Sequence, residues 1–309
     1  MTLVAPFPWF GGKRGVAAEV WRRFGGVRNY VEPFFGSGAV LLQAPVPCQT
    51  ETVNDLDGMV ANFWRAIRSA PDETAEHADW PVNEIDLTAR HLWLVGQRES
   101  LTARLEADTE FCDPKAAGWW VWGLCAWIGT GWCSGTGPWQ VGEDGALTMG
   151  NRGQGINRQL PHLGDRGRGI QDWFAALSER LRGVRVCCGS WERVLTPSVL
   201  ERHGVAGVFL DPPYDDGEVD YAAGGRVASD VREWALERGS DRNLRIALCG
   251  YSEHDSLERA GWSRFRWKAR GGYSSQDGEN ANAERETIWF SPGCLGGVAD
   301  LPLFAGMGA

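Results

Sequence analysis

A short apolar run that ends in two prolines restricts the fold of this chain more than any other feature. Residues 205–210, Val-Ala-Gly-Val-Phe-Leu, read as a buried strand, and Asp211-Pro212-Pro213-Tyr214 follows directly. Because proline lacks a ladder donor and fixes φ, the strand must stop there. A carboxylate and an aromatic ring therefore lie at its carboxyl end, where open α/β sheets bind ligands. Taken alone, the tetrad is equally consistent with an ordinary proline turn capped by Asp211.

The composition is that of a globular protein with material for one or two domains. The chain has 309 residues, of which 43% are hydrophobic and 23% charged. No apolar run approaches the length of a membrane span, and the N-terminus lacks a signal-peptide pattern, so we expect a cytoplasmic protein. The net charge of −9 disfavours non-specific adhesion to nucleic acid but allows a local basic groove.

Cysteine, tryptophan and glycine usage gives two further expectations. The eight cysteines form no Cys-x-x-Cys pair and do not cluster with the five histidines, which favours mostly buried free thiols over a structural zinc site. We therefore predict no metal. The 17 tryptophans and 41 glycines suggest irregular loops packed by large rings rather than long regular helices.

Two glycine-containing turns near the N-terminus have the composition of ligand-binding loops. Residues 6–14 read Pro-Phe-Pro-Trp-Phe-Gly-Gly-Lys-Arg, in which the glycines allow a ligand close to the backbone and Lys13 can present a cation. A solvated Lys13 in a capped loop is the plainer alternative. Further on, a strand over 29–34 runs into Phe35-Gly36-Ser37-Gly38 and then into a helix expected from Ala39, an arrangement that exposes N–H groups to a ligand.

An acidic residue follows this turn at a spacing that is typical of dinucleotide-binding folds. The strand Thr52–Asp55 ends about twenty residues after the glycine turn, where dinucleotide-type folds place a ribose-binding carboxylate. The single Gly-x-Gly is not the full dinucleotide fingerprint, but the two signals reinforce each other.

The remaining chain alternates helices and strands around one unusual segment. Residues 70–169 are rich in tryptophan, glycine and arginine and read as an inserted subdomain, which leaves 1–69 and 170–309 as a discontinuous main domain. The alternation predicts an α/β fold with a mainly parallel sheet covered on both faces. The expected helices lie at 16–24, 59–69, 88–105, 170–182, 229–238 and 255–260, and the remaining strands at 184–188, 245–249, 265–268 and 286–290.

Taken in order, these motifs resemble the Dam-like adenine-specific (N6) DNA methyltransferases. The resemblance rests on the aromatic Gly-Gly-Lys loop, the Phe-x-Gly-x-Gly turn, Asp55, the long insert and the Asp-Pro-Pro-Tyr tetrad, and it covers both ends of the chain. It implies a Rossmann-like fold that uses S-adenosyl-L-methionine, with residues 70–169 as a target-recognition subdomain. It further implies methyl transfer to the N6 amine of an adenine flipped out of double-stranded DNA.

The resemblance also assigns residues to roles. The implied cofactor-binding residues are Trp9, Lys13, Glu32, Phe35, Gly36, Gly38, Asp55, Ser190, Trp191 and Asp211. The implied catalytic residues are Asp211, Pro212, Pro213 and Tyr214. The candidate DNA-binding residues are Arg152, Arg158, Arg166 and Arg168 in the insert and Tyr273 and Ser274 in a later loop.

The tetrad suits this chemistry for a physical reason. An exocyclic adenine amine is a poor nucleophile because its lone pair is delocalised into the ring. If the Asp211 carboxylate and the Pro212 carbonyl each accept an N–H bond, the nitrogen can pyramidalise and direct its lone pair at a methyl group. Tyr214 offers a face on which an extruded base can stack.

Several alternatives stay open on the sequence. The tetrad would serve cytosine-N4 methylation equally well, and a catalytically silent DNA-binding relative would keep the same fold. Residues 127–133 differ from the Asn/Tyr-rich segment that reads GATC in the family, so the recognition sequence is not carried over. The tryptophans of residues 119–127 are read as packing rather than as wedges in a DNA stack. A restriction endonuclease partner is neither required nor excluded.

Overall fold

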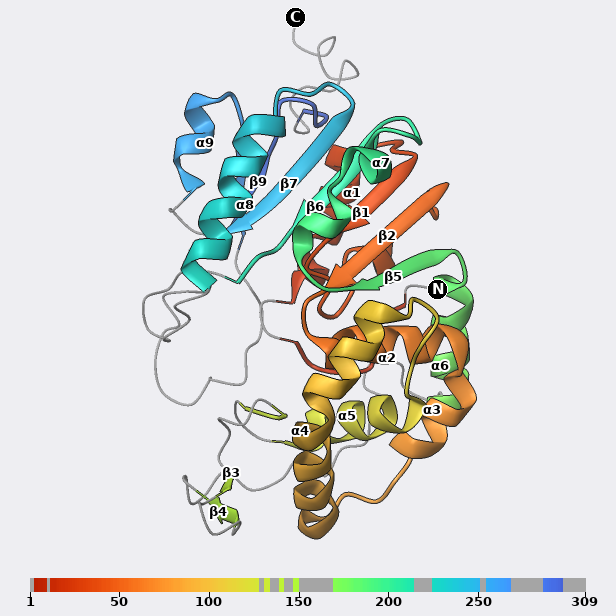
Figure 1. The fold of residues 1–309 in the computed structure, drawn as a ribbon. Coiled ribbons are helices and arrows are strands. Elements are labelled where there is room, and N and C mark those ends of the chain that lie inside the picture. Colours follow the sequence, from red (N-terminus) through yellow and green to blue (C-terminus); the bar gives the residue numbers. More distant parts are fainter. Residues whose placement is uncertain are drawn as a thin grey trace, which may run out of the picture. The chain divides into compact units, whose positions relative to one another are not determined.

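The chain divides into two compact units. The computed structural model describes residues 3–9, 12–127, 131–133, 139–141, 147–149, 169–213, 224–250, 254–267 and 286–296 (Figure 1). The helical unit comprises Met1–Phe10, Gly36–Gly38 and Asn54–Ser190, and the sheet unit comprises Gly11–Phe35, Ala39–Val53 and Trp191–Ala309. One boundary between the units falls inside the strand Thr50–Asp55, between Val53 and Asn54.

A mainly parallel sheet confirms the predicted α/β class and is consistent with a Rossmann-like methyltransferase fold. Its seven strands have the order β5-β2-β1-β6-β7-β9-β8. Strand β1 pairs in parallel with β2 and β6, β6 pairs in parallel with β7, and β9 is antiparallel to both β7 and β8. The strands are β1 (Asn29–Glu32), β2 (Thr50–Asp55), β5 (Val184–Cys188), β6 (Ala206–Leu210), β7 (Leu244–Gly250), β8 (Ser263–Arg266) and β9 (Thr287–Phe290).

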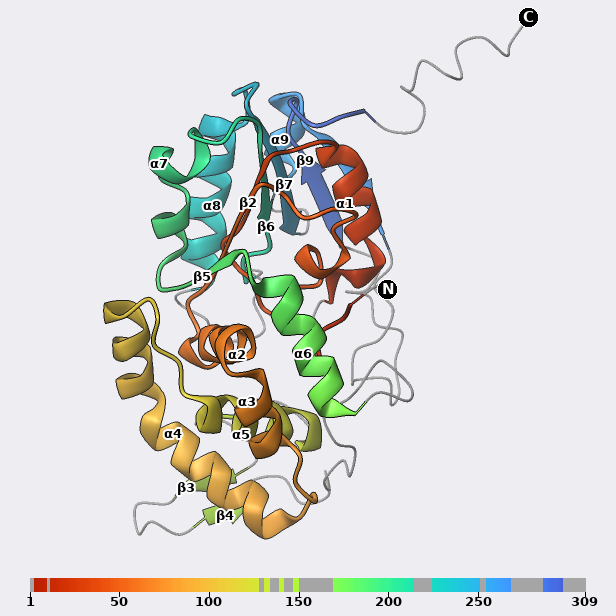
Figure 2. The same cartoon turned by 90° about the vertical axis from the view of Figure 1, so that its right-hand side faces the viewer.

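The central strands are apolar because both of their faces are covered. Every residue of β1 and β6 is buried, as expected for parallel strands. Helices α1 (Ala17–Phe24) and α8 (Gly224–Arg238) lie on opposite faces of the sheet, and α7 (Pro197–Leu200) and α9 (Ser256–Arg259) complete the sheet unit (Figure 2). A Cβ at Gly207 would lie 2.9 Å from the Phe24 ring, so a glycine in β6 allows α1 to pack closely.

The helical unit contains a longer helix than the composition suggests. Its helices are α2 (Gly58–Ser69), α3 (Pro71–Ala78), α4 (Glu84–Ala107), α5 (Pro114–Ala126) and α6 (Ile170–Leu181), and two short strands, β3 (Trp139–Val141) and β4 (Leu147–Met149), pair in antiparallel fashion. The expectation of irregular loops in place of long helices is wrong for α4, which has 24 residues. Its N-terminus is capped by Asn83, and Gly96 is the only glycine inside it.

Aromatic rings form the core of the helical unit, which agrees with the packing interpretation of the tryptophan run. The Phe7 ring lies against the rings of Phe63, Trp64 and Trp120, with centroid distances of 5.3 to 5.9 Å. Trp120 and Trp122 on α5 are buried at 3% and 0% exposure. Burial of rings this large supplies much of the hydrophobic stabilisation available to a unit of this size.

The helix predicted from Ala39 is not present. The chain forms only a short 3-10 helix, Leu41–Gln43, after the glycine turn. Pro45 and Pro47 follow almost at once, and proline both removes a helical donor and disfavours the α conformation of the preceding residue. The glycine turn therefore does not open a regular helix.

Candidate active site

In the helical unit, the Asp55 carboxylate at the end of β2 is held by backbone donors. Its Oδ2 accepts from the Gly36 amide at 2.9 Å, and its Oδ1 accepts from the Asp57 amide at 2.9 Å. A carboxylate has about four lone-pair sites. The Leu56 amide also interacts with this carboxylate, so its two oxygens together retain capacity for about one further hydrogen bond.

Burial makes Asp55 a carboxyl group that titrates near neutral pH. Desolvation raises its pKa to about 7, and the hydrogen bond from Gly36 opposes this shift. The nearby Asp57 carboxylate raises the pKa further, while the amides of Asp57 and Leu56 lower it. A small change in surroundings can thus change the charge of Asp55 around pH 7.

Two hydrogen bonds and a left-handed backbone conformation define the position of Gly36 within the same unit. Its amide binds Asp55, its carbonyl oxygen accepts from Trp64 Nε1 at 2.8 Å, and its φ of 46° is in the left-handed region. A Cβ at this position would lie 2.4 Å from Trp9 Nε1. The position requires glycine both for its backbone conformation and for the close approach of the Trp9 ring, which is itself 40% exposed.

The turn after β5 lies beside the end of β2. The Gly189 amide donates to the Asp55 carbonyl oxygen at 3.1 Å, and Asn54 Nδ2 donates to the Gly189 carbonyl oxygen at 2.9 Å. Gly189 has a φ of 129°, and the next residue, Ser190, is exposed. The structure therefore brings the predicted residues Trp9, Gly36, Asp55 and Ser190 into one region of the helical unit.

In the sheet unit, the tetrad aspartate, which is 23% exposed, forms an ion pair with the buried Lys13. Lys13 Nζ lies 3.0 Å from Asp211 Oδ1 and 3.5 Å from Glu286 Oε2. The lysine side chain is 5% exposed, which contradicts the solvated alternative. Burial opposes its charge, but Asp211, Cys249 and Glu286 outweigh burial and raise the pKa of Lys13.

The remaining predicted residues of the sheet unit are mostly buried. Glu32 is 2% exposed and accepts from the Tyr30 hydroxyl at 2.8 Å, and Phe35 is buried. Trp191 stacks on the Phe34 ring with a centroid distance of 6.3 Å. Pro212 is buried and Pro213 is exposed at the end of β6.

With both groups described, the comparison with known families can be stated. Residues 9–84 match the model of the D12 class N6 adenine-specific DNA methyltransferases. No curated protein matches the chain. The matched segment contains the N-terminal loop, the glycine turn and Asp55, whereas the tetrad lies outside it. The match confirms the predicted resemblance and supports adenine-specific DNA methylation as the activity of this enzyme.

All six predicted DNA-binding residues fall outside the described residues. Those positions are Arg152, Arg158, Arg166, Arg168, Tyr273 and Ser274, and Tyr214 of the tetrad lies outside them as well. No group of three or more His, Cys, Asp or Glu side chains in the described part of the chain is arranged to hold a metal ion. No helix among the same residues is long and apolar enough to cross a membrane.

The segment that differs from the GATC-reading part of the family is packed against α4 where it is described. Trp127 stacks on the His91 ring at a centroid distance of 5.0 Å, and Trp132 lies 5.4 Å from the same ring. The Cys133 amide donates to His91 Nδ1 at 3.3 Å. These two tryptophans are buried at 6% and 8% exposure and therefore serve packing.

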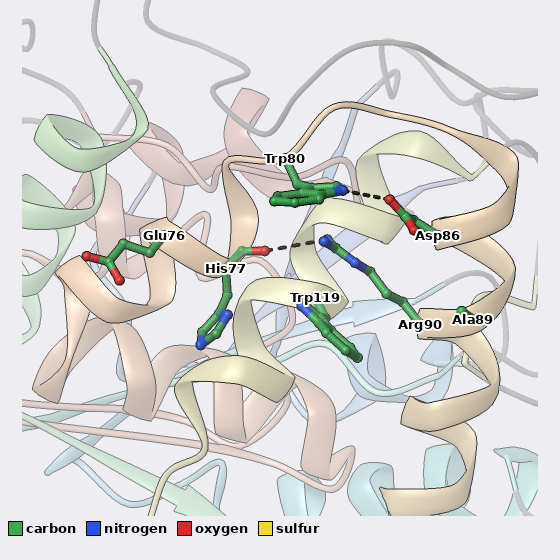
Figure 3. Close-up of a pocket in the computed structure, with 7 residues that line it drawn as sticks. All are labelled: Glu76, His77, Trp80, Asp86, Ala89, Arg90 and Trp119. Carbon is green, nitrogen blue, oxygen red and sulfur yellow. Dashed lines mark hydrogen bonds between the residues drawn. The ribbon is translucent and has the colours of Figure 1, made fainter.

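A cavity of about 370 Å³ lies between α3, α4 and α5 (Figure 3). The Arg90 guanidinium lies over the Trp122, Trp119 and Trp80 rings, at 4.2, 5.0 and 5.6 Å from their centroids. Burial lowers the pKa of Arg90 to about 10. An internal cation thus occupies the aromatic cage, so these tryptophans too act in packing.

Sequence reasoning misses several residues that position the predicted ones. Glu286 contacts Lys13, Trp64 holds the Gly36 carbonyl, and Asp57 donates its amide to Asp55 while capping α2 through Met59. The Asp57 role could have been found, because an Asp before an apolar helix is a capping signal. The contacts of Glu286 and Trp64 join distant segments and leave no local pattern.

Proposed function

We propose that this chain transfers a methyl group from S-adenosyl-L-methionine to the N6 amine of an adenine flipped out of double-stranded DNA. The observation that carries the proposal is the ion pair of buried Lys13 with Asp211 at the carboxyl end of β6, together with the D12 class match. The pair keeps an ionised, oriented carboxylate where the sequence places the amine-binding tetrad.

The residues of the helical unit fit the cofactor on their donor and acceptor chemistry. Asp55 retains some acceptor capacity beyond the backbone amides that it binds, which suits a ribose hydroxyl. Gly36 and Gly38, with φ of 46° and 61°, present backbone without side chains. We assign cofactor contacts to these residues and to Trp9 and Ser190.

The cofactor residues of the sheet unit supply charge and aromatic surface. We assign them as Lys13, Glu32, Phe35, Trp191 and Asp211. When bound, S-adenosyl-L-methionine supplies a methyl group on a positively charged sulfur. The stacked Phe34 and Trp191 rings provide an apolar surface of the kind on which an adenine can pack.

Catalysis in this proposal is orientational and electrostatic. The Asp211 carboxylate and the Pro212 carbonyl each accept an N–H bond from the target amine, which localises the nitrogen lone pair. Lys13 Nζ lies 3.0 Å from Asp211 Oδ1 and orients this carboxylate. Tyr214 stacks on the extruded base.

DNA binding is assigned to the insert of residues 70–169. Its arginines Arg152, Arg158, Arg166 and Arg168 contact phosphates or guanine edges, and Tyr273 and Ser274 contact the region of the flipped base. We place the enzyme in the cytoplasm with its DNA substrate. It acts alone or beside a restriction endonuclease.

Expression in a host that lacks DNA methylation tests the proposal. Long-read sequencing of the host DNA is expected to show N6-methyladenine at one recurring sequence with the wild-type chain and none with Asp211→Ala. Methylation at cytosine N4 in place of adenine would establish the alternative amine as the target. If the host DNA is unmodified and the purified protein is also inactive on that DNA, the proposal is wrong.

A further inference from the structure

We propose that the cavity between α3, α4 and α5 binds the guanine base of a nucleotide, and that Arg90 recognises this base. The cavity has a volume of about 370 Å³, which is within the range of small-ligand sites, and seven residues line it (Figure 3). None of them belongs to the tetrad or to the residues assigned to the cofactor. The inference therefore concerns a second binding site and does not depend on methyl transfer.

Arg90 is a buried cation whose N–H donors are largely unused. The residue is 7% exposed, and within the described part of the chain it forms no ion pair. Its one hydrogen bond to those residues is long, from Nη1 to the His77 carbonyl oxygen at 3.5 Å. A guanidinium has five N–H donors, so most of them remain available to a ligand in the cavity. Burial without acceptors is costly, and a ligand that accepts these hydrogens offsets the cost.

Three tryptophan rings hold the guanidinium in place. The Arg90 side chain lies between the Trp80 and Trp119 rings (Figure 3), and its guanidinium carbon lies 4.2 Å from the centroid of the Trp122 ring. Ring faces attract the positive charge. An arginine stacked in this way is pre-organised, so less freedom is lost when its N–H groups bind an acceptor. Packing by these rings thus prepares Arg90 for recognition.

Trp80 and Trp119 also give the cavity aromatic walls. Trp80 is 48% exposed and Trp119 is half-buried, whereas Trp122 is fully buried. The Trp80 ring is oriented by Asp86, because its Nε1 donates to Asp86 Oδ2 at 2.6 Å. Large rings with accessible surface pack against planar bases. The cavity is therefore suited to a flat aromatic ligand.

The charges around the cavity favour a neutral ring over an anion. Glu76 and Asp86 each place a carboxylate among the lining residues, and Arg90 places one guanidinium there. Hydrogen bonds from Asn83 and then Trp80 lower the pKa of Asp86 and so favour its ionised form. The three groups together carry one net negative charge, which disfavours entry of a phosphate or a carboxylate. The ligand should instead accept from Arg90 and offer donors to a carboxylate.

Guanine has both properties on its edges. Its O6 and N7 are adjacent acceptors that an arginine binds in bidentate fashion. Its N1–H and amino groups are donors that a carboxylate can accept. Adenine instead has an amino donor beside N7, which would direct an N–H group at those of Arg90. Recognition by Arg90 therefore selects guanine.

The guanine belongs either to a free nucleotide or to an unpaired position in a DNA strand. The edge that Arg90 binds is the same in both. In a Watson–Crick pair, however, the N1–H and amino groups are already bound to cytosine. A fully paired duplex should therefore not compete with GMP for the cavity.

Isothermal titration of the full-length chain with GMP, AMP and IMP tests the proposal. We expect GMP to bind about tenfold or more tightly than AMP. IMP keeps O6 and N7 and should bind within about fivefold of GMP. Single-stranded oligothymidylate with and without one guanine shows whether DNA can supply the base. Equal affinities for GMP and AMP, or no binding of either GMP or the guanine oligonucleotide, would overturn the proposal.

A variant that fills the cavity locates the site. Ala89 lines the cavity from an exposed position of α4, so Ala89→Leu adds volume there and keeps a strong helix former. We expect it to raise the Kd for GMP more than about tenfold. Ala103→Leu is the matched control, because Ala103 is exposed on the same helix and does not line the cavity. GMP affinity that is unchanged in Ala89→Leu would place the binding elsewhere and refute the assignment.

Arg90→Lys tests the recognising residue. Lysine keeps the charge but lacks the planar fork, so we expect the preference for GMP over AMP to fall to less than about threefold. Thermal unfolding checks that the variant is folded, and Ala89→Leu decides the question if it is not. The two proposals fail separately. A chain that binds GMP but does not methylate DNA would refute the proposed function alone, and an active enzyme that does not bind guanine would refute this inference alone.

Discussion

The two strand-end acids of this molecule occupy the same kind of position and have opposite surroundings. Asp55 ends β2 in the helical unit and is held by the neutral amides of Gly36 and Asp57. Asp211 follows β6 in the sheet unit and is held by the Lys13 ammonium. Both lie at carboxyl ends of parallel strands, where sheets bind ligands, and within the described part of the chain only Asp211 forms an ion pair with a cation.

The difference separates a proton-sensitive carboxylate from one that is paired with a cation. Desolvation without a counter-charge raises the pKa of Asp55 to about 7, so its charge responds to pH and to a bound ligand. Lys13 is held as an ammonium against Asp211. A proton-sensitive acceptor suits cofactor binding, and a carboxylate oriented by a cation suits activation of an amine.

Removing the fixed carboxylate should give the largest effect. We expect Asp211→Ala to lower kcat about a thousandfold or more, because the amine loses its charged acceptor, while the Kd for S-adenosyl-L-methionine stays measurable. Transfer of a labelled methyl group to DNA, with dialysis of the cofactor, separates the two quantities. Asp230→Ala, an exposed aspartate on α8, is the control. Unchanged turnover in Asp211→Ala would refute its assigned role.

Removing the proton-sensitive carboxylate should weaken binding rather than chemistry. We expect Asp55→Ala to raise the cofactor Kd about tenfold to a hundredfold, the loss that accompanies one charged hydrogen-bond acceptor. In the wild type the affinity should rise about tenfold between pH 6 and pH 8, because the ionised form accepts from the ribose and the pKa is about 7. Isothermal titration across this range measures both.

The raised pKa of Asp55 also determines how the stability of the helical unit changes with pH. An acid whose folded pKa is raised binds more protons folded than unfolded, so the ligand-free helical unit should lose stability as pH rises from about 4 through 7. In Asp55→Asn both pH dependences should flatten. A wild-type affinity that is constant from pH 6 to pH 8 would show that Asp55 does not bind the cofactor in its charged form.

Local sequence patterns were sufficient to predict that Asp55 and Asp211 lie at strand ends. They could not predict contacts between segments that are distant in the sequence. The strand end before Asp211 follows from a short apolar run and from Pro212, which are local signals. Asp55 was predicted from the spacing of its strand after the glycine turn. The contact of Lys13 with Glu286 joins segments at opposite ends of the chain, and a single sequence carries no signal for such a pair.

Glycine positions were the least reliable predictors of local structure, because the role of a glycine depends on neighbours distant in sequence. Two glycines of α5 lie inside a helix: a Cβ at Gly118 would lie 2.5 Å from the His77 side chain, and one at Gly123 would lie 1.8 Å from the Trp132 ring. They permit close packing rather than turns. Gly36, by contrast, has the positive φ that its Gly-x-Gly context indicates.

Gly36→Ala should moderately lower both the stability of the helical unit and the affinity of the Asp55 region for the cofactor. The alanine must adopt a φ of 46° and place its Cβ 2.4 Å from Trp9 Nε1, so we expect a loss of about 1–2 kcal/mol in unfolding free energy and weaker cofactor binding. Urea unfolding and tryptophan fluorescence measure the two effects. Gly183→Ala, with no atom within 4 Å of the added Cβ, is the matched control and should be neutral or slightly stabilising.

Arg98→Gln should give the smallest effect, because Arg98 reaches Asp55 only through Asp57. Arg98 Nη2 contacts Asp57 Oδ2 at 2.8 Å and Nη1 donates to the Cys133 carbonyl oxygen at 2.7 Å, and its side chain is 37% exposed. We expect a loss of about 0.5–1 kcal/mol in unfolding free energy, as for a partly exposed ion pair, and a rise in cofactor Kd of less than about threefold.

The matched control for this last change lies on the same helix. Arg104 lies over the Phe111 ring at 3.7 Å, so Arg104→Gln should cost a similar amount of stability and leave the cofactor Kd unchanged. If Arg98→Gln weakened cofactor binding as much as Asp55→Ala, the two backbone amides would be insufficient to hold Asp55. The proposed contrast between an acid fixed by neutral donors and one fixed by a cation would then be wrong, since both would depend on a neighbouring positive charge.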